Sequence, residues 1–373
     1  MPNKFLPPTT NSATRTAVTP LDGELLYDTD EKKLYSGDGI TLGGVAITST
    51  DTLTDKSLYY YDASSKLLKP IPIGTLDQVL VAKPSLNPPY QFATVNGTGG
   101  REILTSNRTY YVRTDGSDSN NGLVNTSGGA FLTIQKFFDV LVTLDKNGFN
   151  VTCQVADGTY TLTSDITVKD GIGQGKVILI GNTTTPSNVT ITSSNNLRYI
   201  NKSIEGTLEV KGFRFINTGT GTEVCFLFVS NGVVAISNLD FGSTGSGSPL
   251  SQTHMNVSAK GIIHLIGNYT ISGSSPYHQL VLSNGIIRDF LGYDSTLSPI
   301  TVTLTGSPSF AVFLLVSHGG IYDVYYLRQT FTGSATGTRY LSNRLGGIFT
   351  FGGGANYIPG NSAGSTSLGG IYE

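Results

Sequence analysis

A short phrase that returns along residues 224–351 constrains the fold of this chain more than any other feature. In each copy an apolar run ends in Ser, and a Gly follows within a few residues, before a second apolar run begins. The serines of the five copies are 28, 25, 34 and 25 residues apart, and they are Ser230, Ser258, Ser283, Ser317 and Ser342. Self-similarity at a period of about 20–50 residues is typical of a solenoid.

Each repeat contains three short strand-like runs. Two of them flank a break, as in residues 207–210 and 213–216, and the third precedes the serine, as in residues 224–229. Ser, Asn and Gly end these runs, which predicts a chain that turns three corners and returns above itself. One coil cannot bury its inward face alone, so several coils must stack. Residues 291–299 lengthen one repeat, and we interpret them as an insertion at a corner.

The alternative fold is a β-sandwich with glycine-rich turns, because such a sandwich also spaces its strands regularly. The repeat favours the solenoid, since a sandwich has no reason to return five times to the same phase of Ser and Gly. Either fold is all-β.

Composition and charge limit the classes of partner that this chain is expected to bind. The net charge is −2 and only 13% of the residues are charged, which argues against nucleic acid and against an anionic membrane surface. The longest apolar runs are far shorter than the roughly 20 residues that span a bilayer, so we expect no membrane insertion. The first residues lack the apolar core of a secretion signal, which predicts synthesis in a cytosol. There Cys153 and Cys225 are expected to be buried thiols.

The N-terminal segment predicts a hairpin and an assembly. Residues 24–28 and 33–36 are alternating strands joined by a polar turn, and an isolated hairpin is marginal in water. Copies of the same chain are the simplest partners. The phrase at residues 19–28, continued by residues 32–39 and by Gly43 and Gly44, resembles the N-terminal segment of phage tail fibres and tropism-determinant proteins. That resemblance implies a trimeric β-prism that attaches the fibre to the virion.

The rest of the chain fits the same family. Residues 107–152 contain a strand at 110–112 and an amphipathic helix at 132–144, which can cover the open end of a solenoid. This order resembles the entry segment of right-handed β-helix proteins of the pectate-lyase-like type, which are common among phage tailspikes. We therefore expect an elongated homotrimer with five parts: anchor 1–50, interwoven β shaft 51–106, capping strand and helix 107–150, parallel β-helix 151–335 and glycine-rich distal tip 336–373.

No motif predicts a cofactor, a metal site or a catalytic residue. The glycine-rich residues 171–176 precede a strand rather than a helix, so they are a turn and not a phosphate loop. Residues 360–364 match a nucleophile elbow without its strand-turn-helix context. Asp115, Asp118 and Asn120 could hold Ca²⁺, but their spacing favours an Asx turn. The four histidines, His254, His264, His278 and His318, are expected at corners or on the surface.

The expected function is attachment of a phage tail fibre to a bacterial surface polysaccharide or lipopolysaccharide, in the virion and through a tail or baseplate protein held by the N-terminus. Aromatic and basic residues expected on corners or in the distal third could form the receptor site: Tyr277, His278, Tyr293, Arg339, Tyr340 and Arg344. The alternative is a tailspike depolymerase, which needs two carboxyl groups about 5–9.5 Å apart. Its available acids are Glu209, Asp240, Asp289, Asp294 and Asp323. A third possibility is a structural fibre that carries a separate receptor-binding protein.

Overall fold

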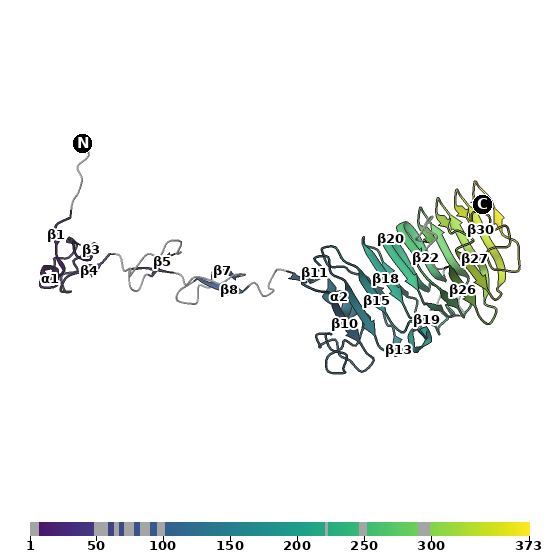
Figure 1. Ribbon diagram of the computed structural model, residues 1–373, viewed down its shortest axis with the longest axis horizontal. Coiled ribbons are helices and arrows are strands. Elements are labelled where there is room, and N and C mark those ends of the chain that lie inside the picture. Colours follow the sequence, from purple (N-terminus) through teal and green to yellow (C-terminus); the bar gives the residue numbers. More distant parts are fainter. Residues whose placement is uncertain are drawn as a thin grey trace. The chain divides into compact units, whose positions relative to one another are not determined.

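The computed structural model describes residues 7–47, 59–62, 67–70, 78–82, 90–94, 101–220, 223–245, 252–289 and 299–373 (Figure 1). The chain forms two compact units, Met1–Gly100 and Arg101–Glu373. Within the described part it is an all-β protein, and no helix there is long and apolar enough to cross a membrane.

The first unit contains short antiparallel pairs. The predicted hairpin is confirmed, because β2 (Leu25–Asp28) pairs antiparallel with β3 (Lys33–Ser36). The same sheet contains β1 (Thr9–Thr10) and β4 (Val45–Ala46), and α1 (Ser12–Arg15) follows β1. Two further hairpins join β5 (Tyr59–Asp62) to β6 (Leu67–Pro70) and β7 (Gln78–Ala82) to β8 (Tyr90–Thr94), where the sequence predicted strands.

A buried ion pair stabilises residues 7–47. Arg15 Nε donates to Asp28 Oδ2 at 2.7 Å, and the Arg15 guanidinium lies 3.7 Å from the centre of the Tyr35 ring. Only two large apolar side chains of this segment are buried, Leu26 and Tyr35. Six are exposed: Val18, Leu21, Ile40, Leu42, Val45 and Ile47. In this segment more of the large apolar side chains are therefore exposed than buried.

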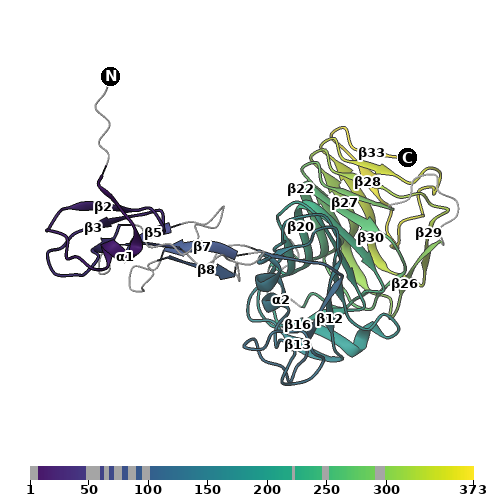
Figure 2. The same ribbon diagram turned by 60° about the vertical axis from the view of Figure 1, so that its left-hand side comes forward.

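The second unit confirms the predicted right-handed parallel β-solenoid, which has about seven turns. Its strands form three parallel stacks that run the length of the unit (Figures 1 and 2). The first stack contains β10 (Arg108–Val112), β12 (Val151–Val155), β15 (Val177–Ile180), β18 (Thr207–Lys211), β25 (Ile286–Asp289), β28 (Ile321–Asp323), β31 (Gly347–Phe349) and β33 (Ile371–Tyr372).

The other two stacks complete the three sides of each coil. The second contains β13 (Gly158–Thr161), β16 (Val189–Ser193), β19 (Arg214–Asn217), β21 (Asp240–Phe241), β23 (Tyr269–Ile271), β26 (Ile300–Leu304) and β29 (Gln329–Thr332), with η1 (Pro186–Asn188) before β16. The third contains β14 (Ile166–Thr167), β17 (Arg198–Lys202), β24 (Tyr277–Leu282), β27 (Ser309–Ser317), β30 (Thr336–Asn343) and β32 (Ser365–Thr366). Two long strands, β20 (Cys225–Ser237) and β22 (Thr253–Leu265), pass through the corner and belong to both the first and the third stack.

The repeated Ser and Gly phrase is the corner between the third and first stacks. Several residues there have left-handed backbone, including Ala259 at φ 51° and His318 at φ 53°. The glycine that follows packs against the preceding coil, because a Cβ atom on Gly261 would lie 2.1 Å from the Val229 carbonyl oxygen. The period seen in the sequence therefore records a steric requirement that recurs once per coil.

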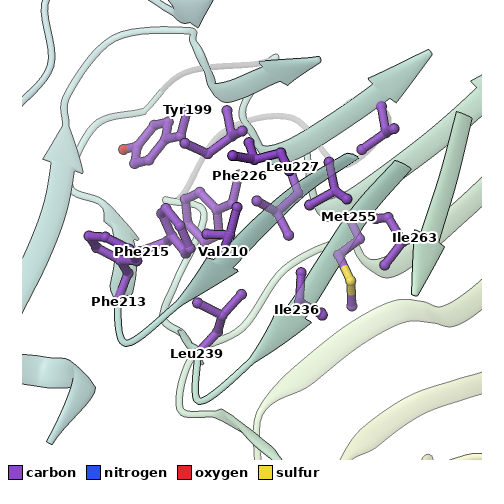
Figure 3. Packing of buried hydrophobic residues seen from close by; sticks show 14 of the residues in the cluster. Tyr199, Val210, Phe213, Phe215, Phe226, Leu227, Ile236, Leu239, Met255 and Ile263 are labelled. Carbon is purple, nitrogen blue, oxygen red and sulfur yellow. The ribbon is translucent and has the colours of Figure 1, made fainter. Parts of the chain in front are cut away.

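Aromatic rings fill the interior of the solenoid. Tyr199, Phe213, Phe215 and Phe226 gather around neighbouring aliphatic side chains such as Val210 and Leu227 (Figure 3). From Tyr199 a column of rings continues along the axis, with 4.8–5.8 Å between successive ring centres, through Phe226, His254, His278, Phe313, Phe331 and Tyr357.

The predicted helix covers the first coils. It is α2 (Ile134–Leu141), shorter at both ends than the expected 132–144, and it buries Ile134, Phe137, Phe138 and Leu141. The side chain of Thr133 accepts from the Lys136 amide and caps it. The Asp118 carboxylate accepts from the backbone amides of Leu132 and Thr133, 14 and 15 residues later, so it joins its loop to the start of the helix and does not bond the neighbouring backbone of an Asx turn. Before the helix comes β9 (Glu102–Ile103), which pairs with β11 (Leu144–Asp145).

The glycine-rich tail continues the solenoid at its distal end. The strands β32 and β33 pair with β30 and β31, and Ile358 is fully buried. The Tyr372 ring stacks on Tyr340 at 4.1 Å. The predicted burial of the cysteines is confirmed, since Cys153 and Cys225 are buried free thiols.

Candidate aromatic binding site

An exposed aromatic cluster lies at the corner between the first and second stacks in the distal coils. We call it the aromatic corner, and it consists of Tyr325, Tyr326, Leu327 and Phe351. Residues 325–327 connect β28 to β29, and Phe351 follows β31 in the next coil. The amide of Tyr326 donates to the Thr350 carbonyl at 3.1 Å, so the two successive coils are joined at this corner.

A tight turn presents these side chains. The amides of Arg328 and Gln329 both donate to the Tyr325 carbonyl, at 2.9 and 3.1 Å. The Tyr325 ring meets Tyr326 at 5.5 Å and Phe351 at 6.2 Å, both edge to face. Tyr325, Leu327 and Phe351 nonetheless remain 38%, 56% and 55% exposed. An apolar cluster held in a defined geometry yet open to water is the kind of surface that marks a binding site.

Glycine allows the backbone to approach the rings. A Cβ atom on Gly352, whose φ is 110°, would meet the Tyr326 ring at 3.3 Å. Phe351 itself has left-handed backbone at φ 56°, which is uncommon for a bulky residue. Uncommon backbone of this kind is concentrated at functional sites.

A buried ion pair supports the turn from beneath. Asp289 ends β25 with 9% of its surface exposed, and its Oδ2 lies 3.8 Å from Arg328 Nε. Burial raises the pKa of Asp289 above its usual value, while a hydrogen bond from the Tyr325 backbone and the charge of Arg328 oppose that rise. The nearby carboxylate of Asp323 raises the pKa further. The aromatic corner thus lies over an acid with an unusual proton affinity.

Interior tyrosines also hold this corner. The Tyr322 hydroxyl donates to Gln329 Oε1 at 2.9 Å, and the Tyr357 hydroxyl donates to the Gln329 carbonyl at 2.9 Å. Tyr322 and Gln329 have no exposed surface. The residue that ends the turn is therefore fixed from the core.

Two of the receptor residues predicted from the sequence are not on the surface. His278 is fully buried in the aromatic column, because its strand turns the ring inward. Tyr340 is 7% exposed and packs under the last coil against Tyr372. The expectation that they lie on an accessible corner or tip was wrong, since the end of the solenoid needs apolar side chains to close its core.

The other predicted receptor residues are scattered. Tyr277 and Arg339 are half-buried in β24 and β30, and Arg339 Nη1 donates to the Ser362 carbonyl at 3.1 Å. Arg344 is exposed and donates to His318 Nε2 at 2.9 Å. Tyr293 lies outside the described residues. Among the described ones, no hydrogen bond or ring contact joins two of these predicted residues.

Three of the four histidines do not lie where the sequence predicted them. His254, His264 and His278 are buried, contrary to the expected corner or surface positions, whereas His318 is exposed at a corner. His254 and the following Met255 are both fully buried, so the inward and outward alternation of β22 is broken there. A pattern of alternating residues could not reveal that break.

The carboxylates considered for cleavage mostly have basic partners. Glu209 pairs with Lys211 at 2.5 Å, and Asp240 pairs with Arg214 at 3.4 Å. Asp294 lies outside the described residues. Asp323 of β28 pairs in register with Arg288 of β25, the residue directly before Asp289. Asp289 and Asp323 are thus the two of these acids that come from successive coils near the aromatic corner.

Sequence reasoning missed the aromatic corner. The sequence feature that could have revealed it is the run Tyr325-Tyr326-Leu327, which lies just after a strand. The Ser and Gly phrase did not point there, because it marks a different corner of the coil. In the parts of the chain that the structure describes, no group of His, Cys, Asp and Glu residues could hold a metal ion.

Comparison with known proteins adds no relative. No family model, no curated protein and no solved structure matches this chain. Its function is therefore argued from its own residues.

Proposed function

We propose that this protein is a phage tail fibre that attaches to a glycan of a bacterial surface through the aromatic corner. The observation that carries the proposal is the exposed, ordered cluster of Tyr325, Tyr326 and Phe351. Aromatic faces pack against the apolar faces of sugar rings, while tyrosine hydroxyls bond to their polar edges. In this proposal the fibre belongs to the virion and its N-terminal unit binds a tail or baseplate protein.

The proposed fibre is a homotrimer, and the exposed apolar surfaces support self-association. In the N-terminal unit those surfaces include Leu21, Ile40 and Leu42, which are 75%, 85% and 63% exposed. Surfaces of this kind mark association sites. Three chains that each bind weakly would gain avidity when they engage one cell together.

The outward faces of the solenoid also differ in polarity. The first stack carries an aliphatic row in register, Val233, Ile262, Ile286 and Ile321, and the third stack carries Leu280, Leu315 and Leu341. The second stack instead presents threonines, among them Thr159, Thr190, Thr270, Thr303 and Thr332. Contacts between chains would bury the first and third faces and leave the second in water.

A binding experiment tests the aromatic corner. The full chain is applied to an array of purified bacterial capsular polysaccharides and lipopolysaccharides, beside the variant Tyr325→Ala/Phe351→Ala. We expect the double variant to lose about 5- to 150-fold in affinity, because about 1–3 kcal/mol of stacking is removed. Leu345→Ala, which removes a more exposed apolar side chain at another corner, should bind as the native protein does. Equal binding by the native protein and the double variant would exclude the site.

A depolymerase of the same shape is the second candidate, and one observation favours it. The pKa of Asp289 is raised, in part by the charge of Asp323, and glycan cleavage needs a carboxyl group with a raised pKa as its general acid. Incubation with the bound polysaccharide and an assay for new reducing ends separates the candidates. Release of oligosaccharide that disappears in both Asp289→Asn and Asp323→Asn would replace adhesion with cleavage.

A further inference from the structure

We propose that the buried contact between His254 and His278 is an acid-sensitive lock on the coils that carry the aromatic corner. The lock is a feature of the fold itself. A role of the lock in regulating glycan binding rests on the function proposed above.

The contact exists only while at least one ring is neutral. His254 Nδ1 and His278 Nδ1 lie 2.9 Å apart, so one nitrogen donates and the other accepts. The two rings come from successive strands, β22 and β24, and neither has exposed surface. A second proton would place two N–H groups against each other, and the contact would become repulsive.

The surroundings offer no counter-charge. Phe226 and Phe241 stack on His254 at 5.5 and 5.4 Å, and Phe313 lies 4.8 Å from His278. Phe310 of β27 faces both imidazoles, at 6.0 and 6.2 Å. Among the residues that the structure describes, the titratable side chain that contacts the pair is Tyr269 of β23, whose hydroxyl lies 3.3 Å from His278 Nε2. The Gly242 backbone lies beside His254. Within the described ranges no charged side chain contacts either ring, so a bound proton would be an uncompensated buried charge.

Burial therefore holds both rings neutral. It lowers the pKa of His254 to about 3 and the pKa of His278 well below its ordinary value, where the neighbouring His254 contributes as well. The closed coils do not take up protons in mild acid. An opened state, in which the rings meet water, does so near their ordinary pKa of about 6.5.

A short path joins the histidines to the aromatic corner. The Tyr269 hydroxyl lies between His278 and the side chain of Gln329. The side-chain oxygen of Gln329 accepts from the Tyr322 hydroxyl, and the backbone amide of Gln329 donates to the Tyr325 carbonyl at 3.1 Å. Opening of the histidine contact would therefore loosen the residue that fixes the aromatic turn.

The direction of the pH effect follows from proton linkage. Because the pKa values are lower in the closed state, the opened state binds more protons below about pH 6.5, and stability falls as pH falls. Each histidine favours opening by about fivefold between pH 6.5 and pH 5.5, so the pair favours it by about 30-fold over that range.

Hydrogen–deuterium exchange of the full chain tests the lock without any glycan. We expect exchange in residues 253–282 and 321–329, corrected for intrinsic rates, to report at least about 30-fold more opening at pH 5.5 than at pH 6.5. His254→Phe/His278→Phe should reduce that dependence by about 30-fold, because phenyl rings suit this aromatic site and do not titrate. What remains, about fivefold at most, belongs to His264 of β22, because burial lowers the pKa of that ring to about 4. His318→Gln, which changes the exposed histidine, should keep the native dependence.

Two results would overturn the lock. One is a native protein whose opening is the same at both pH values, and the other is a double variant that keeps the native dependence. If the double variant does not fold, His278→Gln alone should reduce the native dependence between pH 6.5 and pH 5.5 by about fivefold. Glycan binding at pH 7.5 is measured separately, so its failure removes the proposed function and leaves the lock standing, and the reverse also holds.

Discussion

Gly261 packs against the backbone of the preceding coil, where a Cβ atom would lie 2.1 Å from the Val229 carbonyl oxygen. The same relationship recurs at the corner of each following coil. Gly285 would meet the Val257 carbonyl at 2.5 Å, and Gly346 would meet the Val316 carbonyl at 2.4 Å. Contacts this short do not occur between real Cβ atoms and backbone, so these positions exclude any side chain.

Gly261→Ala should therefore destabilise the solenoid by about 1–3 kcal/mol, the usual cost of overpacking in a structure that cannot shift freely. Thermal unfolding of the full chain measures the loss. The matched control is Gly128→Ala, because a Cβ atom there would have no neighbour within 4 Å. We expect the control to stay within about 0.5 kcal/mol of the native protein. Equal shifts in the two variants would show that coil stacking does not restrict Gly261.

This steric requirement explains why the fold could be predicted from the sequence. Each coil needs glycine at the same corner, so the Ser and Gly phrase recurs in the sequence once per coil. The helix α2 was visible for a similar reason, because Ile134, Phe137, Phe138 and Leu141 recur at helical spacing and all face the core. Both signals are local consequences of packing.

The candidate site had no comparable signal. The rings of Tyr325 and Phe351 meet only because two coils stack in one register, and 26 residues of chain separate them. His278 was expected outside because a polar residue in a strand usually faces water, but paired imidazoles can be buried when they satisfy each other. Contacts between coils depend on register, which a single sequence does not specify.

The two cysteines should be inert in the native protein. Both thiols are buried, and burial raises the pKa of Cys225 to about 12. The thiolate is the reactive form, so a rise from 9.0 to about 12 lowers its population at pH 8 about a thousandfold. A thiol-reactive dye at pH 8 should label neither residue in buffer and both in denaturant. Rapid labelling of the folded protein would contradict the buried positions.

The ion pair in the N-terminal unit predicts a loss of stability in acid. Burial acts to raise the pKa of Asp28, but hydrogen bonds from Arg15, Ser12 and the Glu31 amide outweigh it and hold the pKa well below its ordinary value. The stabilisation is therefore present above about pH 4 and is lost as pH falls towards the native pKa.

Asp28→Asn should remove that acid dependence and destabilise the unit at pH 7, because Arg15 loses the closer and buried one of its two carboxylate partners and keeps only Glu31. Limited proteolysis of residues 7–47 within the full chain, at pH 7 and with an acid protease at about pH 2.5, measures both effects. Asp22→Asn, at an exposed position, provides the comparison. The ion pair has no such role if the two variants are cleaved alike at pH 7.

The last prediction concerns closure of the distal end. Tyr372 stacks on Tyr340 with 4.1 Å between ring centres and 10° between ring planes, and the Tyr372 hydroxyl donates to the Gly354 carbonyl at 2.6 Å. Tyr340 in turn is only 7% exposed, so it depends on this cover. Tyr372→Ala should expose the last coil and destabilise it by about 2–4 kcal/mol, through lost aromatic area and the gap left behind.

Tyr372→Phe separates the stack from the hydrogen bond. It keeps the ring on Tyr340 and removes one partly exposed hydroxyl, so its cost should be about 1 kcal/mol or less. Hydrogen–deuterium exchange in residues 336–373 should rise strongly in Tyr372→Ala and little in Tyr372→Phe. If both variants exchange equally fast, the hydroxyl rather than the ring closes the solenoid.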